Sequence, residues 1–184
     1  MSNTLYLIRH AHSQQTALPV ETWPLSDLGL LQARRLAEQP FWQDVHIICT
    51  SVEPKAIQTA QIVAERHDLP VEPSFELREL RRPGARVDDY ESVVRQVLEN
   101  PARSVNGWEP AGEAQTRIMT AIERLLALHE NETLAVVSHG LVLTLYLAYL
   151  ADTMPTLDLW RSLSFASVTL VDPERHQVLA RFAT

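Results

Sequence analysis

The chain has 184 residues, of which 46% are hydrophobic and 21% are charged, a balance typical of a globular protein with a full hydrophobic core. Its net charge of -7 argues against broad electrostatic binding to nucleic acid or to an anionic membrane, because both attract a basic surface. The length suits a single domain over residues 1–184, and we expect neither a nucleic-acid nor a membrane partner.

The cysteine count and the N-terminal residues narrow the class of protein further. Cys49 is the only cysteine, so the chain forms no intrachain disulfide and no cysteine-based zinc cluster, and we expect this residue in the core. The N-terminal residues lack the basic start, long apolar stretch and cleavage site of a secretion signal, which predicts a cytoplasmic location.

Strands and helices alternate in the first half of the chain. An apolar run at 4–9 predicts a buried strand,. Apolar residues at helical spacing predict a helix within 24–40, where Ser26 or Asp27 is able to cap the start and Pro40 marks the end,. A second strand is expected at 45–51 and a second helix at 53–67. This alternation favours a parallel α/β sheet.

The second half begins less regularly. A strand fragment and a surface loop are expected over 70–90, where three prolines, a glycine and four arginines occur,. Helices at 89–99 and 113–129 follow, then a strand at 132–140 and a buried helix in the apolar run 140–151, which is well short of the roughly 20 residues that span a bilayer,. Two short strands at 166–171 and 177–182 predict a terminal hairpin, whose apolar residues leave a homodimer possible,.

Two histidines follow strong predicted strands. His10 ends the first strand and His139 ends the third, while Lys55 opens the helix after the second. In an open parallel sheet, ligands bind outside the carboxyl ends of the strands. We therefore expect these residues and Arg9 on one rim, where helix N-termini add backbone donors, and the combination predicts an anion site.

A metal site is the competing interpretation of the first motif. His10 and His12 would face the same side of an extended segment, and a His-x-His pair ends the first strand of many metal-dependent hydrolases,. Those enzymes are barrels of about 250 residues or more, and this chain lacks further clustered ligands. Each residue, taken alone, also suits an ordinary strand end or a solvated charge.

Five segments in order resemble the histidine phosphatase superfamily, the group typified by phosphoglycerate mutase and its small phosphatase relatives. The segments that carry the resemblance are LIRHAHS (7–13), LSDLGLLQARRLA (25–37), TSVEPKAIQTA (50–60), LRE (77–79) and VVSHG (136–140). The resemblance implies a three-layer α/β/α sandwich with a mostly parallel central sheet, like that of phosphoglycerate mutase.

The resemblance also implies site roles and no metal or organic cofactor. His10 would attack phosphorus to give a phosphohistidine, and Glu79 would protonate the leaving oxygen and then activate water. Charge on the transferred group is stabilised by fixed donors. The residues implied to hold or line the phosphate are Arg9, Lys55 and His139, with Thr16, Ser13, Gly140 and Glu113 as further candidates.

Several positions depart from the family pattern or have two interpretations. Lys55 stands where the family has arginine, so a point charge replaces a planar fork. Ala11 replaces a glycine, and Thr16 falls where an asparagine is common. Glu113, in a Gly-Glu segment, is a second candidate for the acid, or an ordinary acidic residue in the first turn of a helix.

We expect a phosphatase acting on small phosphate monoesters. Alternatives are a phosphohistidine protein phosphatase or a phosphoglycerate-type mutase, although mutases of this family are usually longer. A low-activity phosphate-ligand binding protein is the alternative outside the enzymes. Four arginines around the proposed acid suggest a subsite for a second anionic group, with a solvated loop as the competing interpretation: Arg78, Arg81, Arg82 and Arg86.

Overall fold

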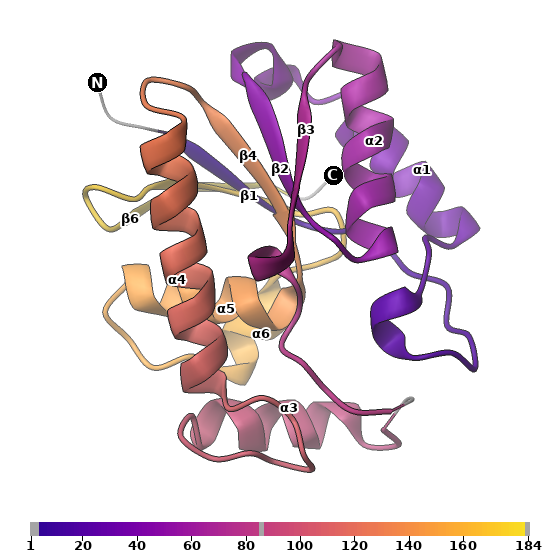
Figure 1. Cartoon of the computed structure of the whole chain (residues 1–184), viewed down its shortest axis with the longest axis vertical. Helices are drawn as coiled ribbons and strands as arrows, with labels where there is room; N and C mark the ends of the chain where they lie inside the picture. Colours follow the sequence, from indigo (N-terminus) through magenta and orange to yellow (C-terminus); the bar gives the residue numbers. More distant parts are fainter. Residues whose placement is uncertain (1–3, 85–86, 183–184) are drawn as a thin grey trace.

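A six-stranded sheet forms the centre of the computed structural model, which describes residues 4–84 and 87–182 (Figure 1). The strand order is β3-β2-β4-β1-β5-β6. The first four of these strands pair in parallel, and β5 and β6 are antiparallel. The predicted mostly parallel sheet and terminal hairpin are thereby confirmed. The strands are β1 (Leu5–Arg9), β2 (Ile47–Ser51), β3 (Val71–Ser74), β4 (Leu134–Ser138), β5 (Val168–Asp172) and β6 (Gln177–Phe182).

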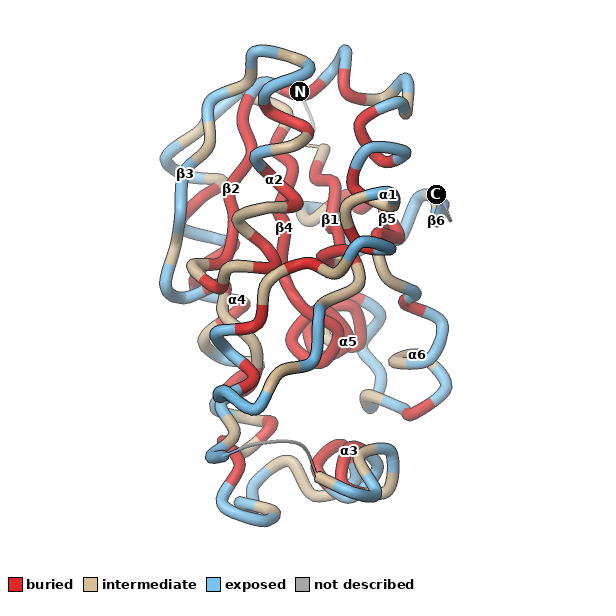
Figure 2. The backbone as a smooth tube through the Cα atoms, turned by 90° about the vertical axis from the view of Figure 1, so that its right-hand side faces the viewer, coloured by how far each residue is buried: buried red, intermediate tan, exposed pale blue. Residues whose placement is uncertain are grey.

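Helices cover both faces of the sheet, which confirms the three-layer sandwich. Figure 1 shows α1 (Asp27–Leu36) and α2 (Pro54–His67) on one side, and α4 (Ala111–Leu128) and α5 (Gly140–Leu150) on the other. Leu5 and Leu7 of β1 pack with α4 and α5, whereas Tyr6 and Ile8 pack with α2. Because both faces are covered, the central strands are apolar throughout rather than alternating, and Figure 2 shows β1, β2 and β4 buried.

The first helix is shorter than the predicted range and is anchored at its start. Ser26 is the N-cap, and its hydroxyl accepts a hydrogen bond from the Gly29 amide at 3.1 Å,. A Cβ on Gly29 would lie 2.0 Å from the His12 carbonyl oxygen, so only glycine lets the helix pack on that segment. The helix ends at Leu36, and a short 3₁₀ helix, η2 (Pro40–Asp44), begins at the predicted stop.

Besides η2, three short elements were not expected from the pattern, and each belongs to a connection near the carboxyl rim. A helix of one or two turns shows no apolar period by which to recognise it. The hydroxyl of Thr156 caps α6 by accepting from the Leu159 amide at 3.1 Å. These elements are η1 (Val20–Thr22), η3 (Phe75–Leu77) and α6 (Leu157–Ser162); α3 (Tyr90–Glu99) matches its prediction.

The most apolar segment of the chain is an internal helix. Every residue of α5 except Tyr149 is buried. Over residues 4–84 and 87–182, no helix combines the length and hydropathy required to cross a bilayer. Cys49 is fully buried in β2, as predicted, and burial raises the pKa of its thiol to about 12, with the nearby Glu72 and Glu132 carboxylates adding to the shift.

Candidate active site

A cavity of about 350 Å³ lies at the carboxyl ends of the parallel strands. Arg9 and His10 enter it from the end of β1, His139 from the end of β4, and Lys55 from the first turn of α2. Glu79 reaches it from the segment after η3. The structure therefore brings together five residues that the sequence spreads over 131 positions, from 9 to 139, and it does so because parallel strands present their carboxyl ends on one rim.

The His10 ring has a defined tautomer. Its Nδ1 lies 2.7 Å from the Ala11 carbonyl oxygen, which can only accept a hydrogen bond, so Nδ1 carries the proton and Nε2 keeps the lone pair. Burial lowers the pKa of His10 well below 6.5, and the charges of His139, Lys55 and Arg9 lower it further,. A neutral imidazole with a free Nε2 is the form that attacks phosphorus.

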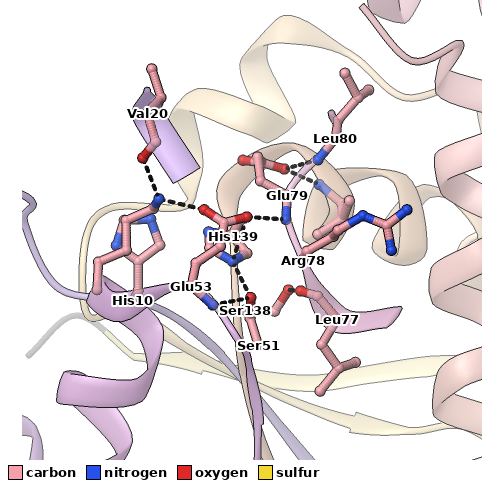
Figure 3. Close-up of polar contacts among 12 residues, drawn as sticks. His10, Val20, Ser51, Glu53, Leu77, Arg78, Glu79, Leu80, Ser138 and His139 are labelled. Carbon is pink, nitrogen blue, oxygen red and sulfur yellow. Dashed lines mark hydrogen bonds and ion pairs between the residues drawn. The ribbon is translucent and has the colours of Figure 1, made fainter. Parts of the chain in front are cut away.

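His139 lies beside His10 and is fully buried. The two ring centroids are 5.0 Å apart, with the rings edge to face. The Nε2 atom of His139 is 2.8 Å from the Ser51 hydroxyl and 3.5 Å from Glu53 Oε1 (Figure 3). Its Nδ1 has no hydrogen-bond partner among the described residues. Burial, followed by the charge of Lys55, lowers its pKa well below 6.5.

Arg9 is held by backbone and aromatic contacts. Its Nη1 donates to the Leu163 carbonyl, and its guanidinium carbon lies 4.1 Å from the centroid of the Phe165 ring. A Cβ on Gly140 would lie 3.1 Å from the Arg9 guanidinium carbon and 3.2 Å from Trp160 Nε1. Gly140 therefore acts by leaving space for the arginine, a role that the sequence did not distinguish from phosphate binding.

Glu53 is a second carboxylate of the site that the sequence analysis missed. Lys55 Nζ donates to the Val20 carbonyl at 2.9 Å and pairs with Glu53 Oε2. Glu53 Oε1 accepts from the Glu79 backbone N–H at 2.8 Å (Figure 3). The signal was its position two residues before Lys55, at the start of a helix on the predicted rim. Because Glu53 pairs with Lys55, its negative charge reduces the net positive charge that Lys55 offers to an anion,.

The Glu79 carboxylate is fixed at the start of α5. Its Oε1 accepts from the amides of Leu80 at 2.9 Å and Val142 at 3.1 Å, and its Oε2 accepts from the Leu141 amide at 3.1 Å. A carboxylate at a helix N-terminus is stabilised by the unpaired N–H groups and the helix dipole. The residue is thus immobilised within the cavity wall, with both oxygens engaged by backbone donors.

Two predicted site residues lie elsewhere. Glu113 is exposed in the first turn of α4 and lines a separate open hollow of about 850 Å³ together with Arg117 and Arg124. Thr16 is not among the cavity residues, and its hydroxyl accepts from the Leu18 amide at 3.2 Å. Ser13 does line the cavity. The Gly-Glu motif begins α4, where the Gly112 amide donates to the Pro101 carbonyl at 2.8 Å.

The arginine cluster is divided between two cavities. Arg82 lines the cavity that contains His10. Its guanidinium carbon lies over Tyr90 and Trp108, at 4.8 Å and 5.4 Å from the ring centroids. Arg78 and Arg81 line an adjacent cavity of about 400 Å³ that shares Val20, Glu79 and Arg82 with the first. Arg86 lies outside the described residues.

Aromatic side chains form much of the cavity wall, which the sequence did not predict because they lie far apart along the chain. Tyr90 from α3 and Trp160 from α6 are tilted toward one another, with ring centroids 5.9 Å apart. Such rings offer flat apolar surface with partially positive edges, and the Tyr and Trp side chains add a hydroxyl or N–H group. The aromatic lining residues are Trp23, Tyr90, Trp108, Trp160 and Phe165.

His12 also lines the cavity. Its Nδ1 lies 2.7 Å from the Ser26 hydroxyl, and His10 Nδ1 is committed to the Ala11 carbonyl. Within residues 4–84 and 87–182, the single group of three metal-ligating side chains with close ligand atoms lies elsewhere and includes neither histidine. Ala11 has no positive φ angle, so alanine is accommodated where the family has glycine.

Known proteins are similar to this chain in sequence and in fold. Residues 5–183 match the histidine phosphatase superfamily (branch 1). An adenosylcobalamin/alpha-ribazole phosphatase of Salmonella typhimurium is 28% identical over 172 residues, covering 85% of this chain and 83% of that protein. A probable phosphoglycerate mutase of Yersinia enterocolitica is 28% identical over 165 residues, covering 85% and 77%. The structure of a phosphoserine phosphatase from Entamoeba histolytica superposes with a TM-score of 0.76 at 20% identity, covering 98% and 97%.

Proposed function

The chain belongs to the histidine phosphatase superfamily, branch 1, and on this premise we propose that it hydrolyses phosphate monoesters through a phosphohistidine on His10, without a metal ion. The observation that carries the proposal is the His10 ring, whose Nδ1 donates to the Ala11 carbonyl, which leaves Nε2 with its lone pair, and which lines a cavity shared with Arg9 and Lys55. The Salmonella relative, named a phosphatase, supports hydrolysis.

The reaction divides into two transfers. In the first, His10 Nε2 forms a bond to phosphorus while the ester oxygen leaves and takes the proton of the Glu79 carboxyl group, which enters this step in its protonated form. In the second, Glu79 accepts a proton from water, the water oxygen bonds to phosphorus, and the nitrogen–phosphorus bond breaks to release phosphate. Arg9, Lys55 and His139 hold the non-bridging oxygens, where charge accumulates in the loose transition state.

The cavity lining favours a flat or apolar leaving group. Beyond the phosphate-holding residues, the lining consists largely of aromatic rings and two valines, and Arg82 is its one further cation among the described lining residues. A sugar-acid phosphate needs several polar partners for its hydroxyl and carboxyl groups. The lining therefore supports a phosphatase for an aromatic or apolar monoester over the mutase activity named for the Yersinia relative.

A phosphate-binding protein with little turnover is the second candidate, and the ion pair of Lys55 with Glu53 favours it. The pair partly neutralises a charge that catalysis would use. Turnover separates the two candidates, because a binding protein holds phosphate without hydrolysing any ester.

The test is hydrolysis of 4-nitrophenyl phosphate and 1-naphthyl phosphate in EDTA, with acid-labile phosphate trapped on the protein after a rapid quench. We expect EDTA-resistant turnover that is lost in His10→Ala, with His46→Ala as the matched control because His46 is exposed. EDTA-sensitive turnover, or full activity in His10→Ala, would contradict the mechanism. Phosphate binding without turnover of any ester would favour the binding protein.

A further inference from the structure

A second cluster of potential metal-ligating side chains lies outside the cavity that contains His10. Cys49 on β2 and Glu72 on β3 are register partners, and His129 caps the C-terminus of α4. The candidate ligand atoms of these three residues all lie within 4.8 Å of one another. In Figure 1 the connection from α4 to β4 lies at the top, whereas α5, which follows His139, lies below the sheet.

The histidine is oriented as a metal ligand. His129 Nδ1 lies 2.8 Å from Glu132 Oε2, and its Nε2 lies 3.2 Å from Glu72 Oε2. If the Glu132 carboxylate accepts the Nδ1 proton, the usual support of a metal-binding histidine, the Nε2 lone pair faces the Glu72 carboxylate, and a cation between these two acceptors would bind both,. His129 and Glu132 are held at this spacing by a turn in which the Glu132 amide donates to the His129 carbonyl at 3.1 Å.

The sulfur of Cys49 is a third potential ligand. Its side chain is fully buried, no hydrogen bond to its sulfur is found among the described residues, and the sulfur is directed at the imidazole and carboxylate. A fully buried thiol of this kind is neither a nucleophile nor a redox centre by exposure. It is suited to binding an ion that enters from the side of the exposed Glu72 carboxylate, whose side chain is 53% accessible.

From this geometry we propose that Cys49, Glu72 and His129 bind a divalent transition metal ion, with zinc as the preferred ion and Glu132 as the residue that positions His129. Thiolate, imidazole and carboxylate together suit zinc or cobalt, whereas magnesium and calcium take oxygen ligands. Tetrahedral zinc with usual bond lengths separates nitrogen and oxygen ligands by roughly 3.4 Å, close to the 3.2 Å between His129 and Glu72.

The proposed site joins three elements and is separate from the phosphate cavity. The ion would tie β2, β3 and the end of α4 together, and on binding it replaces the proton of the Cys49 thiol, which is released. None of the three ligands lines the cavity that contains His10. The ion therefore stabilises the fold and takes no part in phosphate-ester hydrolysis.

Cobalt titration of the chelator-treated protein tests the site directly. We expect one equivalent of Co²⁺ to give a thiolate-to-cobalt absorption band in the near ultraviolet, and zinc to displace it. The band should disappear in Cys49→Ala, and affinity should fall at least tenfold in His129→Gln and Glu72→Gln. Glu132→Gln should lower the affinity for Co²⁺ about 10- to 100-fold, the usual effect of losing a supporting carboxylate.

Two controls separate this site from the histidines of the phosphate cavity and from a simple ion pair. His10→Ala should keep the full band, and zinc should raise the thermal midpoint of the parent but not of His129→Gln, a partly exposed position whose change leaves the core intact. No band in the parent would overturn the proposal, as would a band that survives in Cys49→Ala. An unchanged midpoint with zinc would leave only a histidine bridging two carboxylates, which would also overturn it.

Discussion

Lys55 and Glu53 form an ion pair in the wall of the proposed phosphate site, with side chains only 4% and 8% accessible. The other oxygen of the Glu53 carboxylate accepts a hydrogen bond from the backbone N–H of Glu79. One buried carboxylate thus connects the proposed phosphate ligand to the segment that carries the proposed acid. An entering phosphate group must share Lys55 with Glu53, which makes the binding of anions to this site weaker than the count of its cations suggests.

Glu53→Gln should tighten product inhibition while destabilising the protein. Without the carboxylate, the full Lys55 charge faces the anion, and we expect the inhibition constant of inorganic phosphate to fall about tenfold, equivalent to about 1.4 kcal/mol. Breaking the buried pair should lower the free energy of unfolding by about 3 kcal/mol or more in phosphate-free buffer. Steady-state inhibition measures the inhibition constant, and urea titration measures the free energy of unfolding. Glu21→Gln, an exposed change on the neighbouring cavity, is the matched control, and an unchanged inhibition constant in Glu53→Gln would argue against phosphate contact with Lys55.

Glu79→Gln should reduce turnover in a way that depends on the leaving group. Loss of a general acid costs about 10²- to 10⁴-fold for an alkyl phosphate, whose alkoxide is a poor leaving group, and much less for 4-nitrophenyl phosphate. The exposed Glu113, in a separate hollow, is the control, and Glu113→Gln should leave both rates unchanged. If Glu113→Gln shows the leaving-group dependence and Glu79→Gln does not, the assignment of the acid is reversed.

Stability should fall as the pH drops below the pKa of an unfolded histidine. His10 and His139 both have pKa values held well below 6.5 in the folded protein, mainly by burial. The unfolded chain therefore binds protons at a pH where the folded chain does not, so the free energy of unfolding decreases with falling pH. Two such groups give a slope of about 1.4 kcal/mol per pH unit at pH 6.5, which rises toward about 2.7 kcal/mol per pH unit roughly one unit lower.

Urea titrations between pH 7 and pH 5 measure this slope, in a window above the titration of ordinary carboxyl groups. Replacing one of the two histidines with asparagine should remove about half of it. The same groups predict that the basic form of His10 persists at mildly acid pH, so kcat/KM should show no loss attributable to His10 protonation between pH 7 and 6.5. A flat stability profile would contradict the pKa shifts.

Gly140→Ala should impair phosphate binding through Arg9. The added methyl group would meet the guanidinium at 3.1 Å and Trp160 Nε1 at 3.2 Å, distances at which these groups must shift by a few tenths of an ångström. We expect KM for an aryl phosphate to rise about tenfold, or about 1.4 kcal/mol. Leu28→Ala, on the exposed face of α1, should change neither KM nor stability by more than about 0.5 kcal/mol. Unaltered KM in Gly140→Ala would show that Arg9 is not a phosphate ligand.

The sequence by itself determined the layers, the strand directions and the rim on which the site lies. Apolar runs followed by helical periods specify a parallel sheet covered on both faces, and parallel strands end together, so His10 and His139 had to meet. The motif at 77–79 likewise placed Glu79 correctly near the rim. These results depend on patterns that are local in the chain or on rules of topology, and both are readable without coordinates.

Only the tertiary structure decided which neighbours each site residue has. Glu53 opposes Lys55, Gly140 makes room for Arg9, Glu79 caps a helix that starts 61 positions later, and Glu113 faces a different hollow. Apart from the pair of Glu53 with Lys55, these relationships join segments distant in the chain, whose contacts depend on how helices pack rather than on spacing. The same reason hid the cluster of Cys49, Glu72 and His129, since a strand register and a helix end bring these residues together.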